Sequence, residues 1–297
     1  MAAPPAPPNP NGQVTILECF KDLALKACSI RGADYNMAGS EEKSTVKAII
    51  LSAGQGRRLG SLTANIPKCL LPISGKPIIE WQIDVLLSVG INQVTVVTGF
   101  QSGMVEMLLQ HRYKNDGRIH IAFNPFFSIT DNLVSCWIAR SAMDCDFLLL
   151  NGDTLFEETL LAQVLNSDPA PVTLGVDQKP AYDADDMKVQ LDEDGWIKHV
   201  GKTLRADQID AESVGLVLFR ERGPLLFRDT LEEALRHQTE LKAWYLSIIE
   251  NLAGRQLVKA CFVPEGSWCE IDFPADLTKA EALFGGKRFD RSATVHS

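Results

Sequence analysis

The sequence has no apolar run long enough to cross a bilayer, which excludes a membrane-spanning helix of ordinary length. Its first twenty residues contain neither Lys nor Arg, and the opening M-A-A-P-P-A-P-P-N-P is too rich in proline to form the apolar centre of a signal peptide. We therefore expect no membrane insertion and predict a cytoplasmic location.

Paired metal-binding cysteines are also missing. The sequence contains no C-x-x-C pair and no histidine at ligand spacing from a cysteine. The seven cysteines are Cys19, Cys28, Cys69, Cys136, Cys145, Cys261 and Cys269. Their scatter argues against a zinc site and favours reduced, mostly structural thiols.

Positive charge is scarce, because 29 Lys and Arg stand against 38 Asp and Glu and leave a formal net charge of -9. Nonspecific binding to nucleic acid relies on a cationic face that neutralises phosphates, so this balance disfavours a nucleic-acid partner. A small phosphorylated ligand needs only a local positive pocket. The hydrophobic share of 45% is that of an ordinary globular protein and permits a sizeable core.

Composition divides the 297 residues into three parts. Residues 1–45 are predicted to form a partly disordered extension, in which apolar residues from Val14 to Ala27 recur at the spacing of one short helix. The segment 46–285 is predicted to form a single α/β domain, and 286–297 a C-terminal tail.

Strand and helix patterns alternate through the first half of this domain. The strand patterns cover 46–51, 93–99, 119–123 and 147–150, and the helical patterns between them cover 77–89, 104–109 and 132–142. This alternation predicts a mostly parallel sheet with helices on both faces, and such sheets bind ligands beyond the carboxyl ends of their strands. After Pro169, shorter strands with a hairpin turn at 192–195 are expected, with helices near 225–236, 241–253 and 274–283.

The most informative segment runs from Lys47 to Pro72: K-A-I-I-L-S-A-G-Q-G-R-R-L-G-S-L-T-A-N-I-P-K-C-L-L-P. An apolar run ends in a glycine-rich turn with two arginines, and a Pro-Lys pair follows. Glycines let the chain turn sharply and let a ligand approach the backbone, while amides at the start of a following helix favour anions. The segment matches neither the P-loop nor the dinucleotide fingerprint. A nucleoside triphosphate is the simplest ligand for it.

The same segment resembles the signature of the nucleotidyltransferase superfamily, the sugar-1-phosphate and phosphocholine nucleotidyltransferases: L-x-A-G-x-G-x-R-[LM], then P-K-x-L-x-P. The matching residues are Leu51, Ala53, Gly54, Gly56, Arg58 and Leu59, then Pro67, Lys68, Leu70 and Pro72. Ser52 departs from the alanine usual in the family. The resemblance extends from about Val46 to Phe284 and implies a three-layer α/β/α Rossmann-like fold with a mostly parallel mixed sheet.

This resemblance implies that the backbone of Ala53 and Gly54 faces the base and ribose and that Arg58 and Lys68 hold the triphosphate. Fixed cations there would stabilise the charge that builds on departing pyrophosphate. Arg57 occupies a variable place in the motif, so it could contact either ligand or solvent. The predicted nucleotide-binding set is Leu51, Ala53, Gly54, Gly56, Arg58, Lys68, Gly99, Asn132, Ser135 and Gly152.

Two carboxylates are predicted to hold Mg²⁺. Asp153 follows an apolar strand in N-G-D, at the carboxyl edge of the expected sheet, where an ion that bridges phosphates would take an oxygen ligand. An aspartate that only forms a turn is the alternative. The late W-C-E-I-D resembles the family's W-x-[DE]-I-[DN] and implies that Asp272 is the second ligand, with Glu270 in support. The predicted catalytic residues are Lys68, Arg58, Asp153 and Asp272.

The segment 124–137 resembles phosphocholine and related cytidylyltransferases at Asn132 and Ser135, with Asp131 in place of an asparagine. Asp131 or Asn132 could instead cap the helix that follows.

Three further segments, D-M-K-V, I-K-H-V-G-K and A-E-S-V-G, resemble the inositol-phosphate and phosphonate cytidylyltransferases. They imply that Lys188 and Lys202 bind the phosphate or phosphonate of the second substrate and that Glu212 reaches its other end. The aromatic residues Trp137, Trp244, Tyr245 and Trp268 could cage a quaternary ammonium or belong to the core. The predicted substrate-binding set is Lys188, Lys202, Glu212, Trp268 and Glu270.

These residues predict a Mg²⁺-dependent nucleotidyltransferase that transfers CMP from CTP to a small phospho- or phosphono-alcohol or amine and releases pyrophosphate. Phosphocholine, 2-aminoethylphosphonate and inositol or glycerol phosphate are candidate acceptors. Two alternatives stay open: a hexose-1-phosphate uridylyl- or thymidylyltransferase, and a noncatalytic regulatory subunit that binds nucleotide. We also allow for a homodimer.

Overall fold

The computed structural model describes residues 46–114 and 116–286. The predicted N-terminal extension, with its helix from Val14 to Ala27, and the tail after 286 lie outside the described residues. The boundaries that we assigned to these two parts therefore stay predictions.

A nine-stranded sheet forms the centre of the domain, in the order β10-β9-β11-β6-β1-β4-β5, with β8 beside β11 and β12 beside β8. Strands β6, β1, β4 and β5 run parallel to one another, whereas β11 runs antiparallel to β6. The strands are β1 (Lys47–Ser52), β4 (Val94–Thr98), β5 (Ile119–Phe123), β6 (Phe147–Asn151), β8 (Val172–Asp177), β9 (Lys188–Leu191), β10 (Ile197–Gly201), β11 (Ala211–Phe219) and β12 (Val258–Phe262). The predicted mostly parallel mixed sheet is confirmed.

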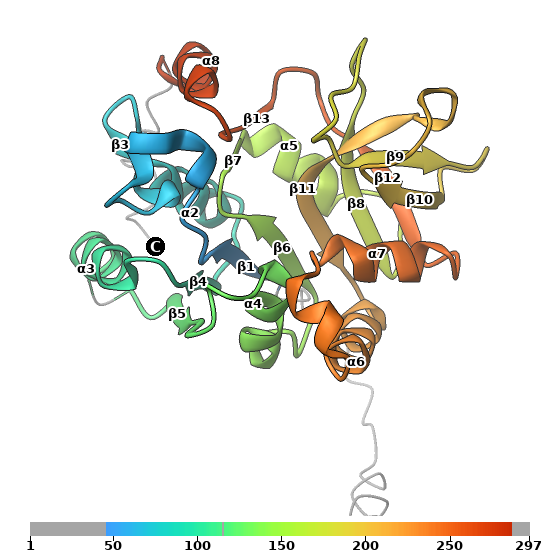
Figure 1. Ribbon diagram of the computed structural model, residues 1–297, viewed down its shortest axis with the longest axis horizontal. Helices are drawn as coiled ribbons and strands as arrows, with labels where there is room; N and C mark the ends of the chain where they lie inside the picture. Colours follow the sequence, from blue (N-terminus) through green and yellow to red (C-terminus); the bar gives the residue numbers. More distant parts are fainter. Residues whose placement is uncertain (1–45, 115, 287–297) are drawn as a thin grey trace, which may run out of the picture. The chain divides into compact units, whose positions relative to one another are not determined.

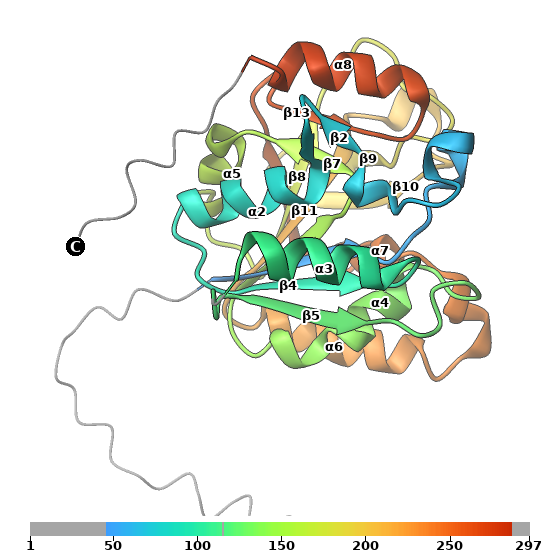
Figure 2. The ribbon, with the colours of Figure 1, turned by 90° about the vertical axis from the view of Figure 1, so that its left-hand side faces the viewer.

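Helices cover both faces of this sheet (Figure 1, Figure 2). One layer holds α2 (Ile78–Ser88), α3 (Ser102–Arg112) and α5 (Glu158–Leu165), and the other holds α4 (Asn132–Ile138), α6 (Gly223–Ala234) and α7 (Leu246–Ala253). Successive side chains of a strand point to opposite faces. Accordingly Ile50 packs in the core under the first layer and Ile49 in the core under the second. The continuous apolar runs in the sequence thus reflect strands that are buried on both faces.

A third, smaller apolar cluster lies under α8 (Pro274–Phe284) and includes Leu59, Trp81 and Ile271. Next to it, β7 (Thr154–Phe156) pairs antiparallel with β13 (Trp268–Glu270), and the short β2 (Pro72–Ile73) pairs with β3 (Lys76–Pro77). The β7–β13 pairing sets Glu270 opposite Thr154, and the N–H of Ile271 donates to the carbonyl of Asp153 at 3.0 Å. Two segments more than a hundred residues apart therefore meet at one point.

Several element boundaries differ from the sequence prediction. The helix expected over 241–253 begins only at Leu246, because the preceding residues form the 3-10 turn η5 (Gln238–Lys242). The short β7 and the helix α5 had no counterpart in our prediction. The remaining 3-10 turns are η1 (Arg57–Thr63), η2 (Lys68–Leu70), η3 (Arg140–Ala142) and η4 (Ala206–Gln208). Among the described residues, no helix has the length and apolarity that a bilayer span requires.

Candidate active site

The glycine-rich turn follows β1 directly, at the carboxyl end of the parallel strands. Gly56 has a φ of 74°, a left-handed conformation, and a Cβ there would lie 2.9 Å from the Cβ of Lys68. Only glycine lets the turn lie this close to the lysine. After Gly56 the chain enters η1, a 3-10 turn, where the sequence suggested a helix start.

Two further predicted glycines are sites of close backbone approach. A Cβ on Gly99 would lie 2.6 Å from the carbonyl oxygen of Ala53, and one on Gly152 would lie 2.5 Å from that of Leu51. The N–H of Phe100 also donates to the Ala53 carbonyl at 3.0 Å. Gly99 and Gly152 therefore support the turn from the ends of the neighbouring strands β4 and β6.

Lys68 connects this turn to the acidic residues. It is buried, and its Nζ lies 2.7 Å from Oδ2 of Asp153 and 2.6 Å from Oδ1 of Asp272. Burial alone would lower the pKa of the ammonium, but the charges of Asp153 and Asp272 outweigh it and raise that pKa above its ordinary value. Arg58 adds a second cation, with Nη1 2.8 Å from Oδ2 of Asp272. Lys68 is thus held as a charged group between the turn and the carboxylates.

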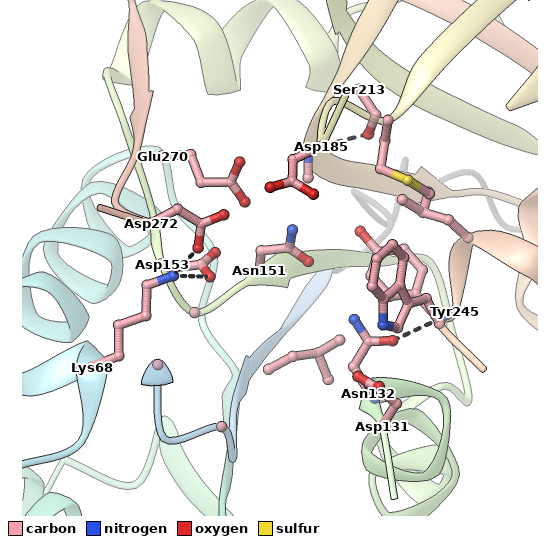
Figure 3. Close-up of a pocket in the computed structure, with 18 of the residues that line it drawn as sticks. Lys68, Asp131, Asn132, Asn151, Asp153, Asp185, Ser213, Tyr245, Glu270 and Asp272 are labelled. Atoms are coloured by element: carbon pink, nitrogen blue, oxygen red, sulfur yellow. Dashed lines mark hydrogen bonds and ion pairs between the residues drawn. The ribbon is translucent and has the colours of Figure 1, made fainter. Parts of the chain in front are cut away.

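Asp153, Glu270 and Asp272 form a cluster in which one carboxylate oxygen from each residue lies within 4.8 Å of the other two (Figure 3). Although Glu270 exposes part of its surface to the cavity, desolvation of its carboxyl and the charges of Asp153 and Asp272 raise its pKa to about 8. Oδ1 of Asp153 is buried and finds no hydrogen-bond partner among the described residues. Clustered carboxylate oxygens with an unsatisfied lone pair suit a divalent cation.

These groups line a cavity of about 460 Å³ at the carboxyl edge of the sheet (Figure 3). The cavity brings together twelve of the residues that the sequence analysis proposed for the site. They are Leu51, Gly54, Gly56, Arg58, Lys68, Asn132, Gly152, Asp153, Lys202, Glu212, Glu270 and Asp272. Arg57, whose role the sequence left open, also lines it.

A second part of the cavity wall comes from the segment before β9, from Lys202 after β10, from β11 and from the start of α7. Nζ of Lys202 lies 4.1 Å from the ring centroid of Trp244, a cation–π contact. Glu212 is buried, and its Oε2 lies 2.9 Å from Nζ of Lys179. Burial raises the pKa of Glu212, although Lys179 acts in the opposite direction. This part of the cavity wall thus combines a half-buried aromatic ring with charges of both signs.

Asn132 belongs to the cavity wall, and Asp131 caps helix α4. Asp131 holds the N-cap position of α4, and its Oδ1 accepts from the N–H of Asn132, the first residue of the helix. Oδ1 of Asn132 accepts from the N–H of Tyr245 at 2.8 Å and so joins α4 to the segment before α7 (Figure 3).

Five predicted site residues do not line the cavity: Ala53, Gly99, Ser135, Lys188 and Trp268. Ser135 is buried and accepts from Nδ2 of Asn124 at 3.1 Å. The indole of Trp268 donates to Asp177 at 2.7 Å. Of the four aromatic residues considered for a cage, Trp244 and Tyr245 line the cavity, whereas Trp137 stacks under Arg140.

Sequence reasoning missed several residues of the cavity wall, among them Asn151, Asp185, Asp186 and Ser213. Asn151 stands in the same N-G-D as Asp153, so its place at the strand end was a usable signal. The two aspartates lie in an irregular segment between β8 and β9, where no periodic pattern indicates which way a side chain points.

Residues 47–178 match the family model described as nucleotidyl transferase. Among curated proteins, the chain is 30% identical over 250 residues to the CMP-5'-(3-aminopropyl)phosphonate synthase of Streptomyces rubellomurinus, an alignment that covers 82% of this chain and 39% of that protein. It is 26% identical over 263 residues to the CTP:phosphoglutamine cytidylyltransferase of Campylobacter jejuni, covering 78% of this chain and 98% of that protein.

Among solved structures, the CTP:phosphocholine cytidylyltransferase of Streptococcus pneumoniae superposes with a TM-score of 0.64 at 20% identity, over 80% of this chain and 99% of that one. This likeness supports the fold. The resemblance read from Leu51 to Pro72 is confirmed by the family match, and so is the enzyme class that it implied, whereas Trp268 to Asp272 lie outside the matched residues. Residues 47–178 therefore belong to the nucleotidyl transferase family, and the relatives of the chain include a CMP-phosphonate synthase and cytidylyltransferases.

Proposed function

We propose that this protein transfers CMP from CTP to a small phospho- or phosphono-alcohol or amine, with release of pyrophosphate and with Mg²⁺ as cofactor. One observation carries the proposal: Asp153, Glu270 and Asp272 gather beside the glycine-rich turn, with Lys68 bound between them. The names of the two curated relatives support cytidine as the base and a phosphorylated or phosphonate compound as the acceptor.

Lys68 and Arg58 would hold the triphosphate. The ammonium of Lys68 has three donors, and Asp153 and Asp272 accept two of them, so a third can reach a phosphate oxygen above the turn. Arg58 is anchored by Asp272 and keeps further guanidinium donors for the same group. Fixed cations at this place stabilise the negative charge that develops on pyrophosphate as it leaves.

Asp153 and Asp272 would hold Mg²⁺, with Glu270 in support. The unsatisfied Oδ1 of Asp153 and the short distances within the cluster fit an oxygen-ligated cation. Mg²⁺ would neutralise phosphate charge and orient the nucleotide. No covalent intermediate with the protein is needed, because the acceptor's own phosphate or phosphonate oxygen can displace pyrophosphate directly.

The acceptor would lie at the other end of the cavity, against Lys202, Glu212 and Trp244. Lys202, which lies over the Trp244 ring, supplies the positive charge for its phosphate or phosphonate. Glu212, which is paired with Lys179, offers a carboxylate to an ammonium group at the far end of the acceptor. A neutral sugar would provide no cation for this carboxylate.

A substrate panel tests the proposal. CTP, UTP, dTTP and GTP are each incubated with phosphocholine, 2-aminoethylphosphonate, inositol phosphate, glycerol phosphate and hexose 1-phosphates, and pyrophosphate release is measured with Mg²⁺. We expect turnover with CTP and one of the first four acceptors. Turnover only with hexose 1-phosphates would identify a nucleotide-sugar synthase instead, and nucleotide binding without any product would identify a noncatalytic subunit.

A further inference from the structure

Lys188 begins strand β9 and is buried, with only 6% of its surface exposed. Its Nζ donates to three main-chain carbonyls: those of Asp183 at 2.6 Å, Lys202 at 3.1 Å and Asp186 at 3.4 Å. An ammonium has three donors, so these carbonyls satisfy all of them. In this arrangement Lys188 has no donor left for a substrate phosphate. Lys202 differs from it, because Lys202 lines the cavity.

The three carbonyls belong to two chain segments that both reach the cavity. The segment 183–187 leads into β9, and its residues Asp185, Asp186 and Met187 line the cavity wall. Lys202 follows β10, which is antiparallel to β9 and sets Gly201 opposite Lys188. The ammonium of Lys188 therefore ties the segment 183–187 to the end of β10 from behind the cavity wall.

The side chains carried by these two segments meet inside the cavity. Oδ1 of Asp185 lies 3.3 Å from Nζ of Lys202, and its Oδ2 lies 3.5 Å from Nη1 of Arg58. Asp186 binds Lys179 at 2.7 Å, and Lys179 in turn binds Glu212. The position of the 183–187 segment thus determines where Lys202 and Glu212 present their charges.

We propose that Lys188 is a positioning residue: it fixes the 183–187 segment against β10 and so holds Lys202 and Glu212 in place for the acceptor. The expected change in the KM for the acceptor rests on the proposed function. The expected loosening of the 183–187 segment concerns the protein without ligand and does not. Without the ammonium, the carbonyls of Asp183, Asp186 and Lys202 would lose the side-chain donor that they share, and the two segments would lose the group that joins them.

Hydrogen exchange on the ligand-free, full-length chain tests the structural part. In Lys188→Met we expect amide exchange at 183–187 and 201–203 to accelerate at least tenfold relative to the unmodified chain. The matched control is Lys198→Met, which removes an exposed lysine of β10, and it should leave exchange in both segments unchanged. This readout does not depend on turnover, so a failure of the proposed function would not obscure it.

Steady-state kinetics tests the positioning role, with whichever panel acceptor the unmodified chain uses fastest. Lys188→Met should raise the KM for that acceptor at least tenfold and change the KM for CTP less than twofold. Because Lys188 acts through Lys202, the double variant Lys188→Met with Lys202→Met should lose no more activity than Lys202→Met alone. A direct contact of Lys188 with substrate would instead give additive losses.

Should Lys188→Met fail to fold, Lys188→Arg replaces it, because the bulkier guanidinium keeps the charge but cannot satisfy the same three carbonyls. In either variant, exchange at 183–187 and the acceptor KM must rise together. A rise in one without the other overturns the proposal, and so does a variant that changes neither.

Discussion

Lys68 is the residue at which the two halves of the candidate site meet. Its ammonium touches carboxylates from the end of β6 and from the segment after β13, and its side chain packs against Gly56 of the glycine-rich turn. A neutral side chain of similar size would leave Asp153 and Asp272 facing each other without a cation. The charge of Lys68 therefore matters to the ligand and to the carboxylates alike.

Replacing Lys68 with methionine should lower kcat/KM by about 10²–10³-fold, because a fixed cation on the leaving phosphate contributes on that order. Pyrophosphate release under the panel conditions measures the loss. The exposed Lys198→Met serves as control and should keep the activity of the unmodified chain. Full pyrophosphate release by Lys68→Met would contradict the role assigned to this residue.

Metal removal tests the acidic cluster. Chelation with EDTA should abolish turnover, and added Mg²⁺ should restore it, because carboxylate oxygens are the ligands that Mg²⁺ prefers. Asp153→Asn removes one charged ligand and should weaken binding of Mn²⁺, followed by calorimetry, at least tenfold. Asp207→Asn, on an exposed turn and paired with Arg205, should leave Mn²⁺ binding unchanged. Tight Mn²⁺ binding by Asp153→Asn would argue against a metal at this place.

At the scale of elements, the ends of β1, β4 and β6 form one rim, and glycines allow the strand ends to approach each other. Gly99 follows β4 and leaves no room for a Cβ against Ala53 of the turn. The pairing of β7 with β13 then brings Glu270 and Asp272 to the same rim from the far end of the chain.

Gly99→Ala should destabilise the protein by about 1–3 kcal/mol, since a Cβ at this site would overlap both the Ala53 carbonyl and the side chain of Phe127. It should also raise the KM for CTP, because the turn must shift to make room. Gly103→Ala is the control: it lies on α3 with no atom within 4 Å of a Cβ, and alanine there should be neutral or stabilising by up to about 1 kcal/mol. Thermal unfolding of both variants shows whether each substitution lowers or raises the stability of the protein. Equal melting temperatures for the pair would contradict this account of Gly99.

At the scale of the whole molecule, the cavity-lining residues that the structure describes all lie between Leu51 and Asp272. All three apolar clusters likewise consist of residues between Val46 and Phe284. The core and the cavity wall that the structure describes thus both lie within the segment 46–285, whose boundaries stay a prediction.

A chain that begins at residue 44 should therefore fold and turn over. We expect its kcat/KM to stay within about threefold of the full-length value, since the cavity-lining residues among 46–114 and 116–286 begin at Leu51. Circular dichroism and pyrophosphate release measure the two properties. A folded but inactive truncation would show that residues 1–43 contribute to the site.

The local sequence pattern was sufficient to predict the strands and helices in the first half of the domain and the position of the glycine-rich turn. Apolar runs buried on both faces and glycines at points of backbone contact leave a direct trace in the order of amino acids, so Asp153 could be named from its place after a strand. Lys68 and Asp272 were named from the resemblance of their motifs to those of the nucleotidyltransferase superfamily. Only the tertiary structure decided that Lys188 is engaged by three carbonyls while Lys202 faces the cavity. The two lysines look alike in the sequence, and the difference arises from pairing of β9 with β10 and from the irregular segment before β9, whose path depends on contacts between residues distant in the chain.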